Sequence, residues 1–408
     1  MTHTSAKPKN IRKNNFILLL NLYRQNTSLS VTKISQIASL SRTTVNKINE
    51  SLIEKKLIIP LGKGESTEFG GKKPNIYTLN SCYGYVLCFV VAMQKVEVKV
   101  YDMQMREVYK SEEKIVYNAS FDKIIQRVKK HWDFFFNDPE GKTPLAVVGA
   151  LPGNVDCAEG RMLHATHFRS WKPKMSLTDI IRERLNTEVP IFVDNWINFN
   201  TYAKKHNGQA ENTSNFLLIN TGYHGVSAGI VINGQIYEGQ HFLAGEVGHM
   251  VIKYDDDVVC QCGGTGCLES LLNIHRLEQK AAGMQETYPD SMLFKYSDSP
   301  SLTTIIKGFQ NKDPLGVILI EEIAKWLAIA LSNICLLIDP QLIIIEGEYN
   351  SAGPEYFSLV QEEYTKVSML RLANRTKLVM KQSIPEVTQS GGAAFAIDHH
   401  LNILGDDL

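Results

Sequence analysis

Three cysteines and three glycines share one stretch of eight residues, and they restrict how this part of the chain can fold. The stretch contains Cys260, Cys262 and Cys267, and His249 stands eleven residues before the first of them. Three thiolates and one imidazole form the ligand set of a closed structural zinc site, whereas a catalytic zinc keeps one position open for water. We therefore expect a structural Zn2+ held by these four residues, with chance clustering of buried cysteines as the alternative.

The chain shows no candidate secretion signal or membrane span. The apolar runs at 16–20 and 326–338 have five and thirteen residues, whereas a membrane-spanning helix needs about 20. Thiols stay reduced in the cytoplasm, so the seven cysteines are not expected to form a disulfide framework. The sequence predicts a cytoplasmic protein with no membrane partner.

The net charge of zero hides two parts of opposite sign. Residues 1–80 contain 13 Lys and Arg but only 4 Asp and Glu, a net charge of +9, and the remaining 328 residues have a net charge of −9. A basic segment joined to an acidic body is typical of a nucleic-acid-binding module fused to another domain. A solubilising basic tail would give the same balance, so charge alone leaves both interpretations open.

Short apolar runs alternate with helical patterns after about residue 83. The patterns that indicate helices lie near 121–136, 176–186 and 314–338. The runs typical of buried strands lie at 85–92, 145–150, 191–193, 216–219, 229–232 and 342–345. This alternation predicts an α/β fold with at least partly parallel sheets.

The basic N-terminal part has the pattern of a helix-turn-helix. Residues 1–10 are polar and basic and predict a flexible arm. Apolar residues around 17–22 predict a first helix, Ser30 opens a second over 30–38, and a third runs from about 42 to 55. The third helix turns a polar face outward, where the first residues of a recognition helix meet base edges in the major groove. The candidate DNA contacts on this face are Arg42, Thr43, Thr44, Asn46 and Lys47.

Two strand-like runs, 57–61 and 75–79, follow the third helix and enclose a connection rich in glycine and lysine. Glycines let a backbone approach phosphates closely, and lysines neutralise them. The connection predicts a basic wing with Lys63, Lys72 and Lys73 as further DNA contacts. A small helical bundle that serves only for dimerisation is the alternative for 11–80.

Several motifs together resemble the ROK family, which groups sugar-responsive repressors with sugar kinases. The resemblance covers nearly the whole chain and is carried by 41–45 (SRTTV), 70–74 (GGKKP), 151–156 (LPGNVD), 170–171 (SW), 244–249 (AGEVGH) and 260–269 (CQCGGTGCLE). It favours the repressor branch, of the xylose or N-acetylglucosamine type. It implies a winged helix-turn-helix followed by a two-lobed, actin-like (ribonuclease H-like ATPase) domain. The implied boundaries are 1–10 for the arm, 11–80 for the DNA-binding domain, 81–195 with 388–408 for lobe 1, and 196–387 for lobe 2 with the zinc loop 249–267.

The resemblance also implies a sugar-binding site. Carried over residue by residue, the sugar hydroxyls would meet Asp194, Asn195, Glu246, His249 and Glu269. The histidine would bind zinc through one ring nitrogen and sugar through the other, which makes the metal an organiser of the sugar site. Solvated surface carboxylates are the alternative for Glu246 and Glu269.

The chain departs from the kinase pattern on the nucleotide side. Family kinases carry an Asn-Asp pair whose aspartate is the base, whereas this chain has Asp194-Asn195, and an amide has no useful basicity. The phosphate-loop stretches 90–94 and 223–229 have lost glycines, and Glu346-Gly347 replaces a Gly-Gly pair. A glutamate at 346 would repel the phosphates of a nucleotide if it faced them. We therefore expect no kinase activity.

The sequence thus predicts a repressor whose affinity for operator DNA changes when a sugar or sugar phosphate binds. Operator half-sites imply a homodimer or homotetramer. One alternative is a sugar kinase with a regulatory N-terminal domain, and another is a sugar-binding scaffold whose N-terminus binds a protein. The identity of the sugar, its phosphorylation, the operator and the direction of the response stay open.

Overall fold

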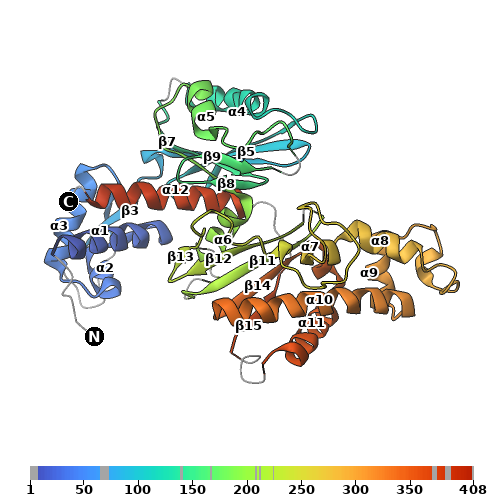
Figure 1. The fold of residues 1–408 in the computed structure, drawn as a ribbon. Coiled ribbons are helices and arrows are strands. Elements are labelled where there is room, and N and C mark those ends of the chain that lie inside the picture. The colour runs from blue at the N-terminus through green and yellow to red at the C-terminus, as the bar shows by residue number, and fades with distance from the viewer. Residues whose placement is uncertain are drawn as a thin grey trace. The chain divides into compact units, whose positions relative to one another are not determined.

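We describe the protein from a computed structural model of residues 8–64, 73–137, 141–165, 168–206, 209–210, 213–223, 225–369, 375–381 and 387–406. The chain divides into two compact units (Figure 1). The first contains Met1–Asp194 and Gln389–Leu408, and the second contains Asn195–Thr388. The C-terminal segment therefore folds with the first unit. In the described part of the chain, no helix is long and apolar enough to cross a membrane.

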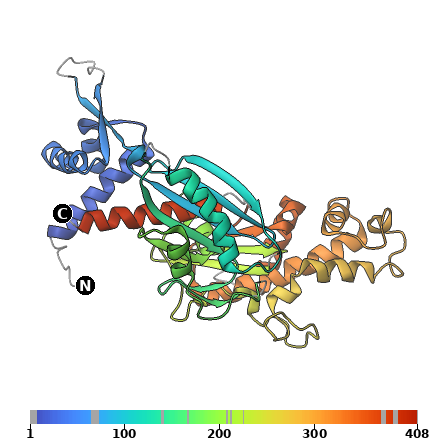
Figure 2. The same ribbon diagram turned by 90° about the horizontal axis from the view of Figure 1, so that it is seen from above.

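Three helices and a small sheet form the N-terminal module of the first unit. The helices are α1 (Pro8–Gln25), α2 (Val31–Ala38) and α3 (Arg42–Glu54). The antiparallel sheet has the order β1-β3-β2, from β1 (Leu29–Ser30), β2 (Ile58–Lys63) and β3 (Asn75–Leu79). Strands β2 and β3 project beyond the helices (Figure 2). These elements confirm the expected order of helices and strands, and the separation of 11–80 as a domain of its own stays a prediction.

The arm expected over residues 1–10 is too long, because α1 begins at Pro8. A proline is tolerated at the first helical position, since its missing N–H would have no partner there. Residues 1–7 lie outside the described residues. Helix α1 buries Phe16, Leu19 and Leu20, whereas Leu18 is 39% exposed and faces away from the core of the module.

The body of the first unit is a five-stranded sheet with the order β10-β7-β4-β5-β6. Strands β4 and β7 are parallel, and the pairs β4–β5 and β5–β6 are antiparallel. The strands are β4 (Tyr85–Val91), β5 (Lys95–Asp102), β6 (Glu107–Lys114), β7 (Pro144–Leu151) and β10 (Ile191–Asn195), with a separate hairpin of β8 (Asn154–Asp156) and β9 (Arg161–His164).

Helices cover both faces of this sheet. Helices α4 (Phe121–Phe136) and α5 (Leu177–Leu185) pack on the face that carries the alternating valines of β5. Helix α12 (Val387–Asp406) lies on the opposite face, where Gln389 donates a hydrogen bond to Glu97 of β5 (Figure 1). Alternation along a strand explains why Glu97 and the valines point to different faces.

The second unit is built on a mixed sheet with the order β13-β12-β11-β14-β15. Strands β11, β14 and β15 run parallel, and β12 and β13 extend the sheet in antiparallel fashion. The strands are β11 (Phe216–Gly222), β12 (Gly225–Ile232), β13 (Gln235–Ile236), β14 (Leu342–Gly347) and β15 (Lys377–Met380). The α/β class with partly parallel sheets is confirmed.

Helix α6 covers one face of this sheet, and a larger helical layer covers the other. Helix α10 forms the centre of that layer, with Asp313 as its N-cap and Pro314 in its first turn. The helices are α6 (Trp196–His206), α7 (Leu268–Leu271), α8 (Ile274–Ala282), α9 (Leu302–Gln310), α10 (Pro314–Ile338) and α11 (Pro354–Val367). The 3-10 turns are η1 (Ser81–Tyr83), η2 (Val247–His249), η3 (Met292–Phe294) and η4 (Glu348–Ala352).

Candidate metal centre and ligand-binding residues

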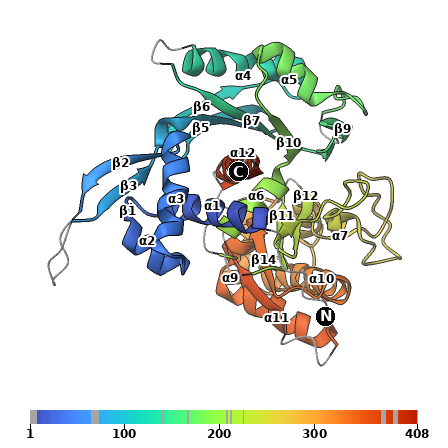
Figure 3. The same ribbon diagram turned by 90° about the vertical axis from the view of Figure 1, so that its left-hand side faces the viewer.

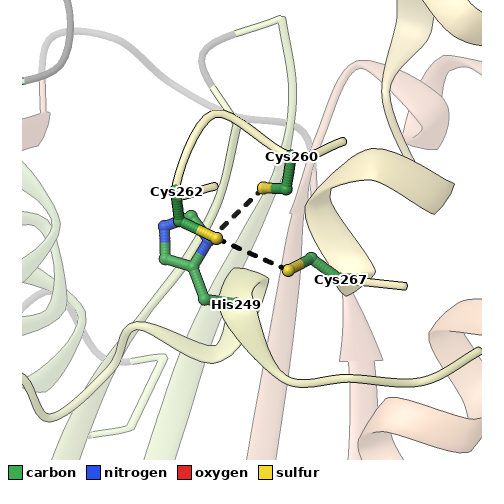
Figure 4. A group of neighbouring side chains, drawn as sticks. All are labelled: His249, Cys260, Cys262 and Cys267. Atoms are coloured by element: carbon green, nitrogen blue, oxygen red, sulfur yellow. Dashed lines mark hydrogen bonds between the residues drawn. The ribbon is translucent and has the colours of Figure 1, made fainter. Parts of the chain in front are cut away.

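The four expected metal ligands lie together in the second unit (Figure 4). One ligand atom from each of His249, Cys260, Cys262 and Cys267 lies within 4.8 Å of the others. The Nδ1 atom of His249 and the Sγ atom of Cys260 are 3.6 Å apart, and so are the Sγ atoms of Cys262 and Cys267. With Zn–S bonds of about 2.3 Å, two ligand atoms of a tetrahedral site lie about 3.8 Å apart. The donor set and its spacing therefore fit one zinc ion.

The backbone of the loop sets this spacing. The N–H of Cys260 donates to the carbonyl of Gly264 at 2.8 Å, which closes a tight turn around Cys262. Gly266 has a φ of +72°, and a Cβ atom there would lie 2.0 Å from the carbonyl oxygen of Lys253. Only glycine fits this position, so Gly266 lets the chain bring Cys267 back to the other ligands.

At two of the three cysteines, the surrounding protein favours the protonated thiol over the thiolate. Burial raises the pKa of Cys260 and raises the pKa of Cys267 to about 12. A hydrogen bond from the backbone at Gly264 lowers the pKa of Cys262. Zinc binds thiolates, so the charge of a bound cation would supply the stabilisation that the thiolates of Cys260 and Cys267 lack.

An ion pair anchors the same loop to α8. Both guanidinium nitrogens of Arg276 bind the carboxylate of Asp256, at 2.6 and 2.7 Å. The side chain of Asp256 is 3% exposed, and the Arg276 hydrogen bonds hold the pKa of this carboxyl below its usual range. Sequence analysis missed this pair, because 20 residues separate its members and neither belongs to a motif.

Two of the expected sugar-binding carboxylates lie beside the metal ligands. An Oε2 atom of Glu246 is 3.8 Å from Nε2 of His249, on the side of the ring opposite the thiols. Glu269 lies in the first turn of α7, two residues after Cys267, and its Oε2 atom accepts a hydrogen bond from the backbone N–H of Val226 at 3.2 Å. The second unit thus brings Glu246, His249 and Glu269 to one region.

The remaining expected pair falls on the boundary between the units. Asp194 belongs to the first unit and Asn195 to the second. The Oδ1 atom of Asn195 accepts a hydrogen bond from the N–H of Ile197 at 3.1 Å, in the first turn of α6. This bond occupies the amide oxygen of Asn195 in a helix-capping role. The contact of Asp194 and Asn195 with a sugar stays a prediction.

Residues 94–398 match the model of the ROK family, which is more than half of the chain. The chain belongs to the ROK family. A xylose repressor from Caldicellulosiruptor bescii is 24% identical over 96% of this chain and 97% of its own. A solved ROK family transcriptional regulator, described as a homologue of the E. coli MLC protein, has a TM-score of 0.80 and 22% identity over 97% of this chain and 99% of its own.

Kinases of the ROK family match a smaller part of the chain. A glucokinase from Halalkalibacterium halodurans is 28% identical over 58% of this chain and 71% of its own. The ROK family model begins only at residue 94, after the N-terminal module. The expected fold, a winged helix-turn-helix followed by an actin-like ROK domain, is confirmed by the likeness to the ROK regulator.

The hairpin between β11 and β12, which the sequence resemblance matches with the second phosphate loop of the ROK kinases, has carboxylates beside its glycines. The Oε2 atom of Glu348 lies where a side chain on Gly222 would begin, 1.4 Å from an ideal Cβ position. Glu269 lies 2.5 Å from the ideal Cβ position on Gly225, which is the cross-strand partner of Gly222. The hydroxyl of Tyr223 donates to Glu278 at 3.4 Å. The hairpin's glycines therefore make room for side chains of the chain itself.

Glu346 is buried and does not face a nucleotide, although its place in the sequence had raised that possibility. Its side chain is completely buried, with Lys204 of α6 at 2.5 Å and Asn200 at 3.4 Å. The repulsion of phosphates considered for Glu346 does not arise there. The carboxylates that do line the hairpin, Glu278 and Glu348, were missed, because they are distant in sequence from the glycine motif.

The expected DNA-contacting residues of α3 lie mainly on its exposed face. Arg42, Thr43, Asn46 and Lys47 are exposed, while Val45 and Leu52 are buried on the opposite face. The hydroxyl of Thr44 is 2.8 Å from that of Ser41, whose Oγ caps the helix by accepting from the N–H of Thr44. On the wing, Lys63 ends β2 and Lys73 precedes β3, and both are exposed, whereas Lys72 lies outside the described residues.

Proposed function

We propose that this chain is a sugar-responsive transcriptional repressor in which α3 and the wing bind operator DNA and the ROK domain binds a sugar. The exposed polar face of α3, joined in one chain to a ROK domain, carries this proposal. The C. bescii relative, which matches nearly the whole length of both chains, is named a repressor. Two-fold operators are bound by dimers, so the active form is a dimer or a larger homo-oligomer.

The DNA contacts follow from the side chains at the start of α3. Arg42 suits the acceptor edge of guanine, and Asn46 suits the donor and acceptor pair of adenine. Lys47, Lys63 and Lys73 neutralise phosphates, which gives affinity without sequence preference. Thr44 contributes to the helix cap, so Thr43 is the threonine whose hydroxyl points outward to DNA.

The sugar contacts come from the wall formed by Glu246, His249 and Glu269. A zinc ion bound by Nδ1 of His249 and the three thiolates fixes the histidine ring and its tautomer. The other ring nitrogen, on the side of Glu246, then faces the ligand. Carboxylates accept, and an imidazole N–H donates, hydrogen bonds to sugar hydroxyls. The zinc organises the site and takes no part in a reaction.

The kinase reaction of the family is lost on the nucleotide side. Glu269, Glu278 and Glu348 lie around the β11–β12 hairpin, and no lysine or arginine pairs with them in the described part of the chain. Added phosphates would meet like charges there. The amide of Asn195 stands at the position of the catalytic base and already accepts a helix-capping hydrogen bond. We infer that the domain binds a sugar without phosphorylating it.

The decisive experiment measures binding to the DNA upstream of the protein's own gene. Fluorescence anisotropy is recorded with and without D-xylose, D-glucose, N-acetyl-D-glucosamine and their phosphates. A sugar that changes the DNA affinity at micromolar to millimolar concentration supports the proposal. Absence of DNA binding at low and high salt would refute it, and sugar-dependent ATP turnover would instead support the kinase alternative.

A pair of variants assigns the DNA contact. Arg42→Ala is expected to weaken operator binding by about 1–3 kcal/mol and to leave sugar affinity unchanged. Arg182→Ala removes an arginine from α5, away from the helix-turn-helix, and serves as the matched control. Equal operator affinity of wild type and Arg42→Ala would show that α3 is not inserted as proposed.

A further inference from the structure

Helix α12 is attached to the sheet of the first unit along one side. Near its start, Nε2 of Gln389 donates to Oε2 of Glu97 at 3.1 Å. Further along, the ring of Phe395 packs edge-on against Phe192 of β10, with centroids 5.2 Å apart. The chain enters α12 directly from the second unit, since the boundary between the units falls after Thr388, in the first turn of this helix. The backbone therefore joins the second unit to the first turn of α12.

The C-terminal half of α12 contacts helix α1 of the N-terminal module. Asp398 forms an ion pair with Arg24 of α1 at 2.8 Å, and the two side chains are only 20% and 12% exposed. Near the end of the helix, Asp406 pairs with Lys13 at 2.7 Å, but Asp406 is 61% exposed. Figure 3, which looks along α12, shows α1 beside it. The Arg24–Asp398 pair is thus the more buried of two ion pairs that join α1 to α12.

Helix α1 continues this connection to the recognition helix. Tyr23, the neighbour of Arg24, donates a buried hydrogen bond from its hydroxyl to Oδ1 of Asn49 at 3.1 Å. Asn49 lies on the inner side of α3, whose outer side carries the proposed DNA contacts. Three helices are therefore linked in series by polar contacts: α12 to α1 by Arg24 and Asp398, and α1 to α3 by Tyr23 and Asn49.

We propose that α12 transmits the state of the sugar site to the DNA-binding module, and that the Arg24–Asp398 ion pair is the coupling contact. The proposal rests on the repressor function proposed above. Coupling between distant sites needs a structural element with two arrangements whose equilibrium both sites influence. A partly buried ion pair meets this need, because a shift of one helix leaves a desolvated charge without its partner. Arg24 and Asp398 are positioning residues, since neither touches DNA or sugar.

Three variants of the full chain test this coupling. Asp398→Asn removes the negative charge of the partly buried Arg24–Asp398 pair, and Asp406→Asn makes the same change in the more exposed Lys13–Asp406 pair. The third variant swaps the charges of the first pair by combining Arg24→Asp with Asp398→Arg. For each protein, operator affinity is measured with and without saturating D-xylose, or whichever sugar of the panel acts on wild type. Sugar affinity is measured separately by calorimetry, and the ratio of the two operator affinities is the readout.

The wild-type ratio is expected in the range of about 5–150-fold that is typical of coupled sites. Asp398→Asn should bring it close to one while sugar affinity stays at the wild-type level, and Asp406→Asn should keep it. The charge swap should restore part of the ratio, and it provides the test if Asp398→Asn does not fold. The coupling role would be overturned if Asp398→Asn kept the wild-type ratio of operator affinities. It would also be overturned if the charge-swapped protein folded but its ratio stayed at one. If the wild-type protein binds no operator DNA, or if no sugar changes its operator affinity, the proposed function is wrong and the coupling with it.

Discussion

Two regions of the second unit differ in what their polar side chains contact. The wall beside the metal ligands presents Glu246, His249 and Glu269, and the loop that carries it is tied down by four potential metal ligands and the Asp256–Arg276 pair. The β11–β12 hairpin instead has Glu348 lying against Gly222 and Tyr223 hydrogen-bonded to Glu278. The first region offers polar groups to a ligand, whereas the second uses them internally.

Under the proposed function, this difference separates the groups that bind a sugar from those that a kinase would need for a nucleotide. A sugar needs fixed hydrogen-bonding groups, which a rigid loop provides. A nucleotide needs backbone donors and open space for phosphates, and the hairpin's own carboxylates occupy that space. Gly222 and Gly225, two glycines that the hairpin does have, accommodate carboxylates in this chain, so glycines in such a hairpin do not by themselves identify a phosphate site.

The largest effect is expected from removing one of the candidate zinc ligands beside the proposed sugar-binding wall. The protein should contain about one zinc per chain, and Cys267→Ser should abolish it and lower the stability of the second unit. We expect a loss on the order of 5 kcal/mol, below the ~10–16 kcal/mol that zinc supplies to small zinc-finger peptides, because the unit has its own apolar core. Elemental analysis and thermal unfolding measure both, with the exposed Cys82→Ser as control. Full zinc content in Cys267→Ser would contradict the ligand set.

The next effect concerns the ion pair under the same loop. Asp256→Asn leaves Arg276 without its partner and should cost about 2–3 kcal/mol, since a broken buried pair costs up to ~5 kcal/mol and Arg276 is 30% exposed. The neighbouring Asp255→Asn, at an exposed position, should be neutral. Because the pKa of Asp256 is lowered in the folded protein, the stabilisation is present at neutral pH. It disappears as pH falls below about 4 toward the lowered pKa. The two variants should thus differ in melting temperature at pH 7 and converge in acid.

A pair of glutamine variants compares the two regions directly. Glu246→Gln should weaken sugar binding about 10–100-fold, as expected for loss of a charge-assisted hydrogen bond. Glu348→Gln changes the hairpin and should leave sugar affinity unchanged. Calorimetry with the active sugar measures both affinities. Equal losses in the two variants would mean that the hairpin belongs to the sugar site, and no loss in Glu246→Gln would remove this residue from it.

The smallest effect distinguishes neutral from phosphorylated sugars. The hairpin carboxylates Glu278 and Glu348 should repel a phosphate group, so we expect a sugar 6-phosphate to bind about tenfold more weakly than the same sugar without it. The difference should shrink as salt rises, because salt screens exposed charges. The opposite result would be a sugar phosphate that binds more tightly than the neutral sugar and loses this advantage as salt rises. It would show that cationic groups, and not the hairpin carboxylates, face the phosphate end of the ligand.

Local features of the sequence were sufficient for much of this description. The four metal ligands lie within 19 residues, so a loop with three glycines brings them together without help from the rest of the fold. Helix α10 was predicted with its observed ends, because Asp313 and Pro314 mark its start and Asp339 its end. Ser30 likewise marked the start of α2, and the structure shows that Ser41 caps α3. Such features depend on backbone hydrogen bonds between neighbours, which a sequence shows directly.

Contacts between distant residues were decided only by the tertiary structure. The direction of the Glu346 side chain depends on Lys204, more than a hundred residues away. The place of Glu348 against Gly222 depends on the parallel pairing of β11 and β14, and the Arg24–Asp398 pair joins the two ends of the chain. Sequence alone predicted the N-terminal helices, several strands of both sheets, helix α10, the candidate metal ligands and the residue types of the candidate site. Packing determined which side chains meet, because burial and ion pairing act on neighbours in space whatever their separation along the chain.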